Sequence, residues 1–572
     1  MLHRATAAVV ASLLLVGASM VGSAVATPVA RGAGRDPSYR LDAPPGTKRL
    51  PPLLAPAVPD ALSRALAQDQ ISAGRYALER AASLFDVARV RARFGAVARP
   101  DPRSATLVLR DLALRLGQLA PEQRREAHRI LARPSEVVDP FGHAYAVPEE
   151  LPVCGAHTCV HYVGSTPDHP PLRNVSGGPA PDHVETVSTI MEAVWAVEVD
   201  GHGYRPPKPD ATSSPENGGD ARLDVYLVDI GDEGIYGYCA SDDPHLDSSY
   251  KFWDMSAYCV LDDDYRFSQF GYPNRLHPLK VTAAHEFFHA VQFGYDIAED
   301  VWLMESTATW MEERVYDGIN DNRQYLVGSP LGQPMIPLDR DTGLRVYGAW
   351  IFWGFLTEYL GGAVPDATIV RQVWKRADGR QGAPDMYSTR ALRMAVGARR
   401  IDGIPWRLRW AFADFGVWNA RPAKFYDEGR AYRTAPVART VTLTRAAPST
   451  RSTAALDHLT NRFLAVRRGA GVKATARLRV VVDGPADATG PEASVLVIRR
   501  SGKANAKPIL LNRSGNGAIT VGFDRTVARV VLIATNASTR YRNCFSGLTP
   551  YACFGGTPVD ENRTFTIRAA IV

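Results

Sequence analysis

The segment that decides the fold is Thr282-Ala283-Ala284-His285-Glu286-Phe287-Phe288-His289-Ala290-Val291. Its apolar spacing, with no Gly or Pro over residues 281–293, predicts a buried helix, and Gly294 is its expected stop. Residues four positions apart on a helix are separated by only about 40° around the axis. His285 and His289 therefore project from one face of the predicted helix. Two imidazoles in this arrangement can bind one cation, so the segment predicts a metal site.

The metal that suits this pattern is zinc, Zn²⁺, because its tetrahedral shell accepts two imidazole nitrogens. Glu286, next to the first histidine, is placed to reach a metal-held water rather than the metal, which is the position of a general base. Sixteen residues after His289, Glu305 lies in a second predicted helix that contains Trp302-Leu303-Met304-Glu305. A carboxylate there can complete a shell of two histidines and one glutamate. The fourth position would remain for water.

These residues resemble those of the gluzincin metallopeptidases, the thermolysin-like group whose third zinc ligand is a downstream glutamate. The resemblance covers residues 281–313 and also extends to uncharacterised secreted bacterial metalloprotease-like proteins that pair His-Glu-Phe/Tyr-Phe-His with Glu-Ser/Gly-Thr-Ala-Thr-Trp. It implies that His285, His289 and Glu305 bind zinc and that Glu286 is the catalytic acid/base. Related folds stabilise the tetrahedral oxyanion with a Tyr or His from a downstream helix, and Tyr347 is the candidate here. The alternative for Tyr347 is a buried aromatic residue that packs under the site.

The sequence also departs from these families in ways that narrow the expected chemistry. The Gly-x-Met-Glu-Asn signature of the aminopeptidases is missing, which disfavours an exopeptidase. Thr309 stands where thermolysin-like enzymes carry an Asp that orients a zinc-bound histidine, so that support is expected from elsewhere or from a weaker hydroxyl bond. No third histidine follows the motif at the spacing of the metzincins.

The 572 residues, of which 45% are hydrophobic, are too many for one compact core. We expect a signal peptide at 1–26 with cleavage after Ala26, a disordered Pro-rich linker at 27–57, and a basic helical region at 58–138 that is either a pro-segment or a retained domain. A catalytic domain at 139–437 and a β-rich accessory domain at 438–572 follow. The predicted fold class is multidomain α+β: a helical N-terminal region, a two-lobed zincin-like catalytic domain with a mixed-sheet lobe and a helical lobe, and a C-terminal β-sandwich.

The six cysteines support an oxidising compartment, because they fall into three close pairs. We expect disulfides between nearest neighbours, although six cysteines allow 15 connectivities. The pairs are Cys154 with Cys159, Cys239 with Cys259, and Cys544 with Cys553.

Charge and hydropathy exclude two classes of partner. The net charge of +6 without Lys/Arg runs argues against nucleic acid. No segment after the signal peptide reaches about 18 consecutive apolar residues, so we expect no membrane span in the mature chain.

A second cation, Ca²⁺, could bind the acidic runs Asp262-Asp263-Asp264 and Asp242-Asp243. The alternative for these runs is a solvated acidic loop. The oligomeric state is left open.

The sequence thus favours a secreted zinc endopeptidase that acts on extracellular proteins or peptides. One alternative is a secreted binding or surface-associated protein with a structural or vestigial zinc site and a recognition function in the β-sandwich. Another is a zinc hydrolase for a different bond, because ligands alone do not fix the substrate. The presence of Glu286 favours hydrolysis, since a structural site needs no base there.

Overall fold

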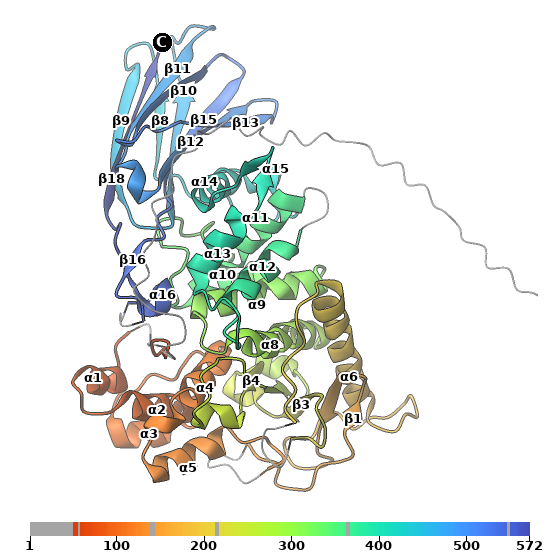
Figure 1. Ribbon diagram of the computed structural model, residues 1–572. Helices are drawn as coiled ribbons and strands as arrows, with labels where there is room; N and C mark the ends of the chain where they lie inside the picture. The colour runs from red at the N-terminus through yellow and green to blue at the C-terminus, as the bar shows by residue number, and fades with distance from the viewer. Residues whose placement is uncertain are drawn as a thin grey trace, which may run out of the picture.

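The computed structural model describes residues 50–54, 56, 58–136, 143–211, 217–361, 366–545 and 549–572. The expected signal peptide and most of the expected linker lie outside these residues. The described chain is mixed α/β: helices of the N-terminal region lie beside a sheet at one end, further helices form the middle, and a β-rich region forms the other end (Figure 1). The expected helical N-terminal region and β-rich C-terminus are therefore confirmed. Within the described residues, no helix combines the length and apolarity that crossing a membrane requires.

The N-terminal region is built mainly from five α-helices, α1 to α5. Asp60 is the N-cap of α1: it accepts a hydrogen bond from the Ser63 amide and forms a capping box with that residue. Residues 50–54 of the expected linker pack onto this region, where the Leu54 amide donates to Asp111 at 2.7 Å. The helices are α1 (Ala61–Ala67), α2 (Ala73–Phe85), α3 (Val87–Phe94), α4 (Ala105–Ala113) and α5 (Pro121–Ile130).

A five-stranded sheet follows, in the order β1-β2-β3-β5-β4, with β2, β3 and β5 parallel. Its two faces belong to different cores because alternate residues of a strand point to opposite sides. Val225 and Leu227 pack with α6 (Asp182–Trp195) and α8 (Leu276–Asp296), whereas Tyr226 and Val228 pack with α2 and α4. The N-terminal helices therefore cover one face of β3, β4 and β5. The strands are β1 (Val153–Cys154), β2 (Thr158–His161), β3 (Leu223–Val228), β4 (Gly237–Ala240) and β5 (Tyr258–Asp262).

Helix α8 carries the two histidines, and α9 (Val301–Tyr316) packs beside it. The predicted stop at Gly294 is wrong by two residues, since α8 continues to Asp296. Gly294 instead permits a close approach, because a Cβ there would lie 3.2 Å from the backbone nitrogen of Lys208. The remaining helices of this part are α7 (Phe267–Phe270), α10 (Leu344–Gly348), α11 (Trp350–Gly361), α12 (Thr368–Ala377), α13 (Ser388–Gly397), α14 (Leu408–Asn419) and α15 (Pro422–Phe425), and the hairpin β6 (Arg400–Ile401) with β7 (Ile404–Pro405) precedes α14.

The C-terminal region contains a five-stranded sheet, β13-β12-β15-β10-β8, and a four-stranded sheet, β14-β11-β18-β9. Both sheets contribute to one hydrophobic core, with Val495 and Leu532 from the first and Val480 and Ile567 from the second. The strands are β8 (Arg439–Leu443), β9 (Ser449–Leu456), β10 (Thr460–Arg468), β11 (Arg477–Asp483), β12 (Pro491–Arg499), β13 (Ala504–Pro508), β14 (Asn516–Gly522), β15 (Val527–Asn536) and β18 (Arg563–Ile571); the short elements β16 (Tyr541–Arg542), α16 (Ala552–Gly555) and β17 (Thr557–Pro558) lie between β15 and β18.

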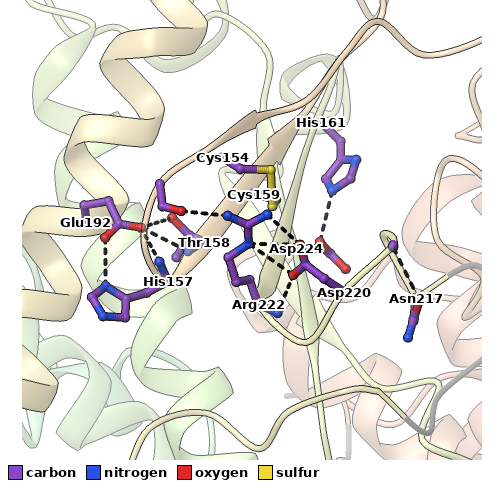
Figure 2. Close-up of a disulfide and its surroundings, with 12 residues drawn as sticks. Cys154, His157, Thr158, Cys159, His161, Glu192, Asn217, Asp220, Arg222 and Asp224 are labelled. Atoms are coloured by element: carbon purple, nitrogen blue, oxygen red, sulfur yellow. Dashed lines mark hydrogen bonds and ion pairs between the residues drawn. A yellow bond between two sulfur atoms is a disulfide. The ribbon is translucent and has the colours of Figure 1, made fainter.

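All six cysteines form the three expected disulfides, which confirms the predicted pairing. Cys154–Cys159 joins β1 to β2 at the edge of the sheet, beside the Glu192 side chain that accepts from the Thr158 amide (Figure 2). Cys239–Cys259 joins two directly paired residues of β4 and β5. Disulfides of this kind are typical of proteins that fold in oxidising compartments.

Candidate metal centre

The structure brings His285, His289 and Glu305 together between α8 and α9. One carboxylate oxygen of Glu305 lies 3.3 Å from Nε2 of His285 and 3.8 Å from Nε2 of His289. One donor atom from each of the three residues lies within 4.8 Å of the others, and all three side chains are buried. Two ligands of a tetrahedral zinc ion at about 2.0–2.1 Å are themselves about 3.4 Å apart. The separations between these donors are therefore close to those of a shared ion.

The Glu305 carboxylate supplies a direct test of whether the residues fit a metal. The residue is only 1% exposed, yet neither carboxylate oxygen has a hydrogen-bond partner among the described residues. Burying such a group without a partner costs several kcal/mol. Burial accordingly raises the pKa of Glu305 above its usual value. A divalent cation held by the three donors would remove this penalty, so the residues fit zinc.

Each imidazole is oriented by a hydrogen bond on its far nitrogen. Nδ1 of His285 lies 2.7 Å from Glu312, and Nδ1 of His289 lies 2.7 Å from the side-chain oxygen of Gln292. The Gln292 amide nitrogen in turn donates to the Met304 carbonyl oxygen at 2.9 Å, next to Glu305 in the chain. Such bonds fix the ring orientation and leave Nε2 available as a ligand.

Glu312 and Gln292 were not identified from the sequence. Thr309, the position where an orienting carboxylate was sought, donates its hydroxyl to the Glu305 backbone carbonyl instead. Glu312 lies seven residues after Glu305, two turns along the same helix, so both face α8. That periodicity and the position of Gln292, three residues after His289, were the available signals.

The electrostatic setting of the two histidines differs. Burial lowers the pKa of His285, but the close contacts with Glu305 and Glu312 and the negative charges of both carboxylates outweigh it and raise that pKa. For His289, burial and the nearby His285 both act to lower the pKa. The two rings thus differ at Nδ1, where His285 meets the Glu312 carboxylate and His289 meets the neutral Gln292 amide.

Glu286 lies on α8 at the edge of this cluster and is also buried. Its carboxylate accepts a hydrogen bond from the Thr106 hydroxyl at 2.8 Å. Burial raises the pKa of Glu286 to about 7, against the opposing effects of the His285 charge and the Thr106 bond. A carboxylate with a pKa near neutrality is suited to exchange protons at neutral pH.

A cavity of about 300 Å³ opens directly on His285 and Glu286. Tyr347, the candidate for oxyanion stabilisation, lines the same cavity, and its ring centre lies 6.5 Å from that of His285. Tyr347 stacks on Tyr325, and the Arg103 guanidinium lies 5.7 Å from the Tyr347 ring centre. The structure therefore brings the expected residues close together: His285, His289 and Glu305 form the donor cluster, and Glu286 and Tyr347 line the cavity that opens on His285.

The acidic runs considered for calcium separate in the structure. Asp262 and Asp263 lie close to Asp229 at the carboxyl ends of β5 and β3, where their oxygens come within 4.8 Å of one another. Asp242 instead binds Arg133, and Asp243 binds Lys208 and the Ser256 amide, so both carboxylates are already engaged by protein groups. Calcium at the first group stays a prediction.

Comparisons with known proteins do not indicate a function for the chain, so any functional proposal depends on the geometry of the site. No family model and no curated protein matches the chain. Among solved structures it is similar to CorA, a surface-associated copper-binding protein important in copper acquisition by Methylomicrobium album BG8, at 12% identity over 24% of this chain and 98% of that one, with a TM-score of 0.16. Tailspike protein 4 of bacteriophage CBA120 matches at 8% identity over 22% of this chain and 19% of that one, with a TM-score of 0.12. A beta-glucosidase from Paenibacillus barengoltzii matches at 10% identity over 23% and 12%, with a TM-score of 0.12. Similarities this low carry no argument about fold or function.

Proposed function

We propose that the chain is a secreted zinc-dependent endopeptidase of the gluzincin type. The observation that carries the proposal is the buried, unpartnered carboxylate of Glu305 facing the Nε2 atoms of His285 and His289. A structural zinc site is normally closed by four protein ligands, whereas this cluster offers three and borders a cavity. Three ligands with an accessible fourth position are the arrangement of catalytic zinc sites.

The chain's own residues have distinct parts in the proposed reaction. When bound, zinc would supply a Lewis-acidic centre that lowers the pKa of water toward about 7. Glu286 accepts the proton of the attacking water and then donates a proton to the leaving amine. The Tyr347 hydroxyl donates a hydrogen bond to the oxyanion that forms at the scissile carbonyl. Glu312 and Gln292 hold the imidazole rings in place.

The surrounding parts of the chain have proposed roles that follow from their positions. We infer that residues 139–437 form a catalytic domain with a sheet lobe and a helical lobe, separated at the α8–α9 site. The two C-terminal sheets would form a β-sandwich accessory domain over their shared core. The three disulfides support action outside the cytoplasm on extracellular proteins or peptides.

Replacing Glu286 with Gln tests the proposal, because the amide keeps the side-chain shape but cannot accept the proton. The variant should bind zinc at the wild-type stoichiometry, measured by metal analysis, and should lose casein cleavage. Glu313→Gln is the matched control, since Glu313 lies on α9 but binds Asn322 rather than either histidine. Casein cleavage by Glu286→Gln at the wild-type rate would refute the proposed role of Glu286. A wild-type protein without zinc-dependent cleavage would refute the function itself.

A further inference from the structure

The general base proposed above has an unexpected partner from the N-terminal region. Thr106, on α4, donates its hydroxyl hydrogen to Glu286 at 2.8 Å. The same hydroxyl oxygen accepts a hydrogen bond from the Cys239 amide at 3.0 Å. Both Thr106 and Glu286 are buried, with exposures of 2% and 6%. A contact between residues 180 positions apart thus reaches the centre of the site.

The direction of this hydrogen bond is fixed by its surroundings. A hydroxyl has one hydrogen to donate, and the Cys239 amide already occupies an acceptor position of the oxygen. The hydrogen is therefore directed at the Glu286 carboxylate. Cys239 itself is held in β4 by pairing with β5 and by the disulfide to Cys259. Thr106 consequently connects the proposed base to a rigid strand.

The N-terminal helices are also inseparable from the sheet that supports the site. They provide the core that covers one face of β3, β4 and β5. Arg133, with a fully buried side chain, binds Asp210, Asp224 and Asp242 of the following part of the chain. Arg110 of α4 donates to the Glu299 carbonyl, next to the start of α9. Removal of this region would expose the sheet, leave the buried Asp210 carboxylate without its cation, and take one charged partner from Asp224 and Asp242.

This region does not block the site as an inhibitory segment would. Asp101, Pro102 and Arg103 form one wall of the cavity, and about 300 Å³ remains open beside His285 and Glu286. Arg103 lies near the rings of Tyr325 and Tyr347, which also line the cavity. The N-terminal region therefore shapes the cavity and leaves it open.

We propose that residues 58–136 are a permanent part of the catalytic unit and that Thr106 is a positioning residue for Glu286. The inference rests on the proposed endopeptidase function. Thr106 holds the carboxylate in the orientation in which it takes the proton of the attacking water. The region is accordingly retained in the active enzyme rather than removed as a pro-segment.

The test compares Thr106→Val, which removes the hydroxyl at nearly constant shape, with Thr106→Ser, which keeps it. Thr106→Val should keep its zinc and its KM for a peptide substrate while kcat falls about tenfold to a hundredfold, as expected for loss of a hydrogen bond to a charged group. Thr106→Ser should recover most of that loss. Thr357→Val is the control, because it removes an equally buried hydroxyl that bonds only to carbonyls of its own helix, α11. Wild-type kcat in Thr106→Val would overturn the positioning role.

A second measurement does not depend on a variant. The mass and N-terminal sequence of the purified, active, secreted enzyme should show that residues 58–136 are present. An active species that begins after residue 136 would overturn the inference. Glu286→Gln, assayed in parallel, distinguishes failure of the proposed function from failure of the positioning role of Thr106. If cleavage depends on Glu286 but not on Thr106, only the positioning role fails. If no cleavage depends on Glu286, the proposed function and the inference fail together.

Discussion

The hydrogen bond between Glu312 and His285 leads to a quantitative prediction about zinc affinity. Nδ1 of His285 lies 2.7 Å from Glu312, and both side chains are buried. Glu312→Gln keeps an oxygen that can accept this bond but removes the negative charge behind the imidazole. Loss of such a partner typically weakens metal binding about 10- to 100-fold, or by about 1.4–2.7 kcal/mol. We expect the variant to fall within that range.

The assay is a competition titration of the metal-free protein against a chromophoric zinc chelator. Circular dichroism of the metal-free proteins establishes that wild type and variants share one fold before zinc is added. Glu313→Gln provides the control: the next residue on α9 changes in the same way, but its carboxylate accepts from Asn322 at 2.7 Å and has no bond to either histidine. Its zinc affinity should stay within about twofold of wild type. Equal zinc affinities for Glu312→Gln and wild type would refute the orienting role of Glu312.

Three further predictions concern stability and turnover. Arg133→Met should lower the free energy of unfolding by about 3–5 kcal/mol in urea titrations, since it leaves the buried Asp210 without its cation and takes one charged partner from Asp224 and Asp242. A loss below about 1 kcal/mol would contradict this. Tyr347→Phe should lower kcat about 100-fold with little change in KM if the hydroxyl binds the oxyanion, whereas an unchanged kcat would leave Tyr347 as a packing residue. Burial lowers the pKa of His458, but Asp339 and Glu561 outweigh it and raise that pKa to about 9. In the unfolded chain the pKa of this histidine is near 6.5, so its protonation stabilises the folded protein by about 3 kcal/mol. This stabilisation is complete below about pH 6.5 and is lost as the pH rises through about 9. His458→Gln should therefore flatten the decline in the free energy of unfolding between those pH values.

The parts of the site that sequence could predict are those set by local periodicity. The four-residue spacing of His285 and His289 places both rings on one helix face, and the apolar pattern around them indicated a buried helix. The three disulfides followed from cysteine spacing alone. The β-rich runs after residue 438 indicated strands, and strands are present there.

The parts that sequence could not predict depend on contacts between distant segments. In the sequence, nothing distinguishes Thr106 from other threonines in helices. Only the folded structure shows its contact with Glu286. Asp242 was considered a calcium ligand, yet it neutralises Arg133 from the N-terminal region. Glu312 lies seven residues after Glu305, which places both on one face of the helix. Every residue at such a spacing shares that face, so the spacing alone does not identify Glu312. Such roles become visible only when the partner on the other element is known.

The most direct test of the account is an anomalous difference map at the zinc absorption edge, from crystals of the protein grown with zinc. We predict one strong peak between Nε2 of His285, Nε2 of His289 and the Glu305 carboxylate, at about 2.0–2.2 Å from each. A fully occupied peak elsewhere, for example at Asp229, Asp262 and Asp263, with none at the histidine pair would contradict it. A Glu305 side chain turned away from both histidines in the same map would do so equally.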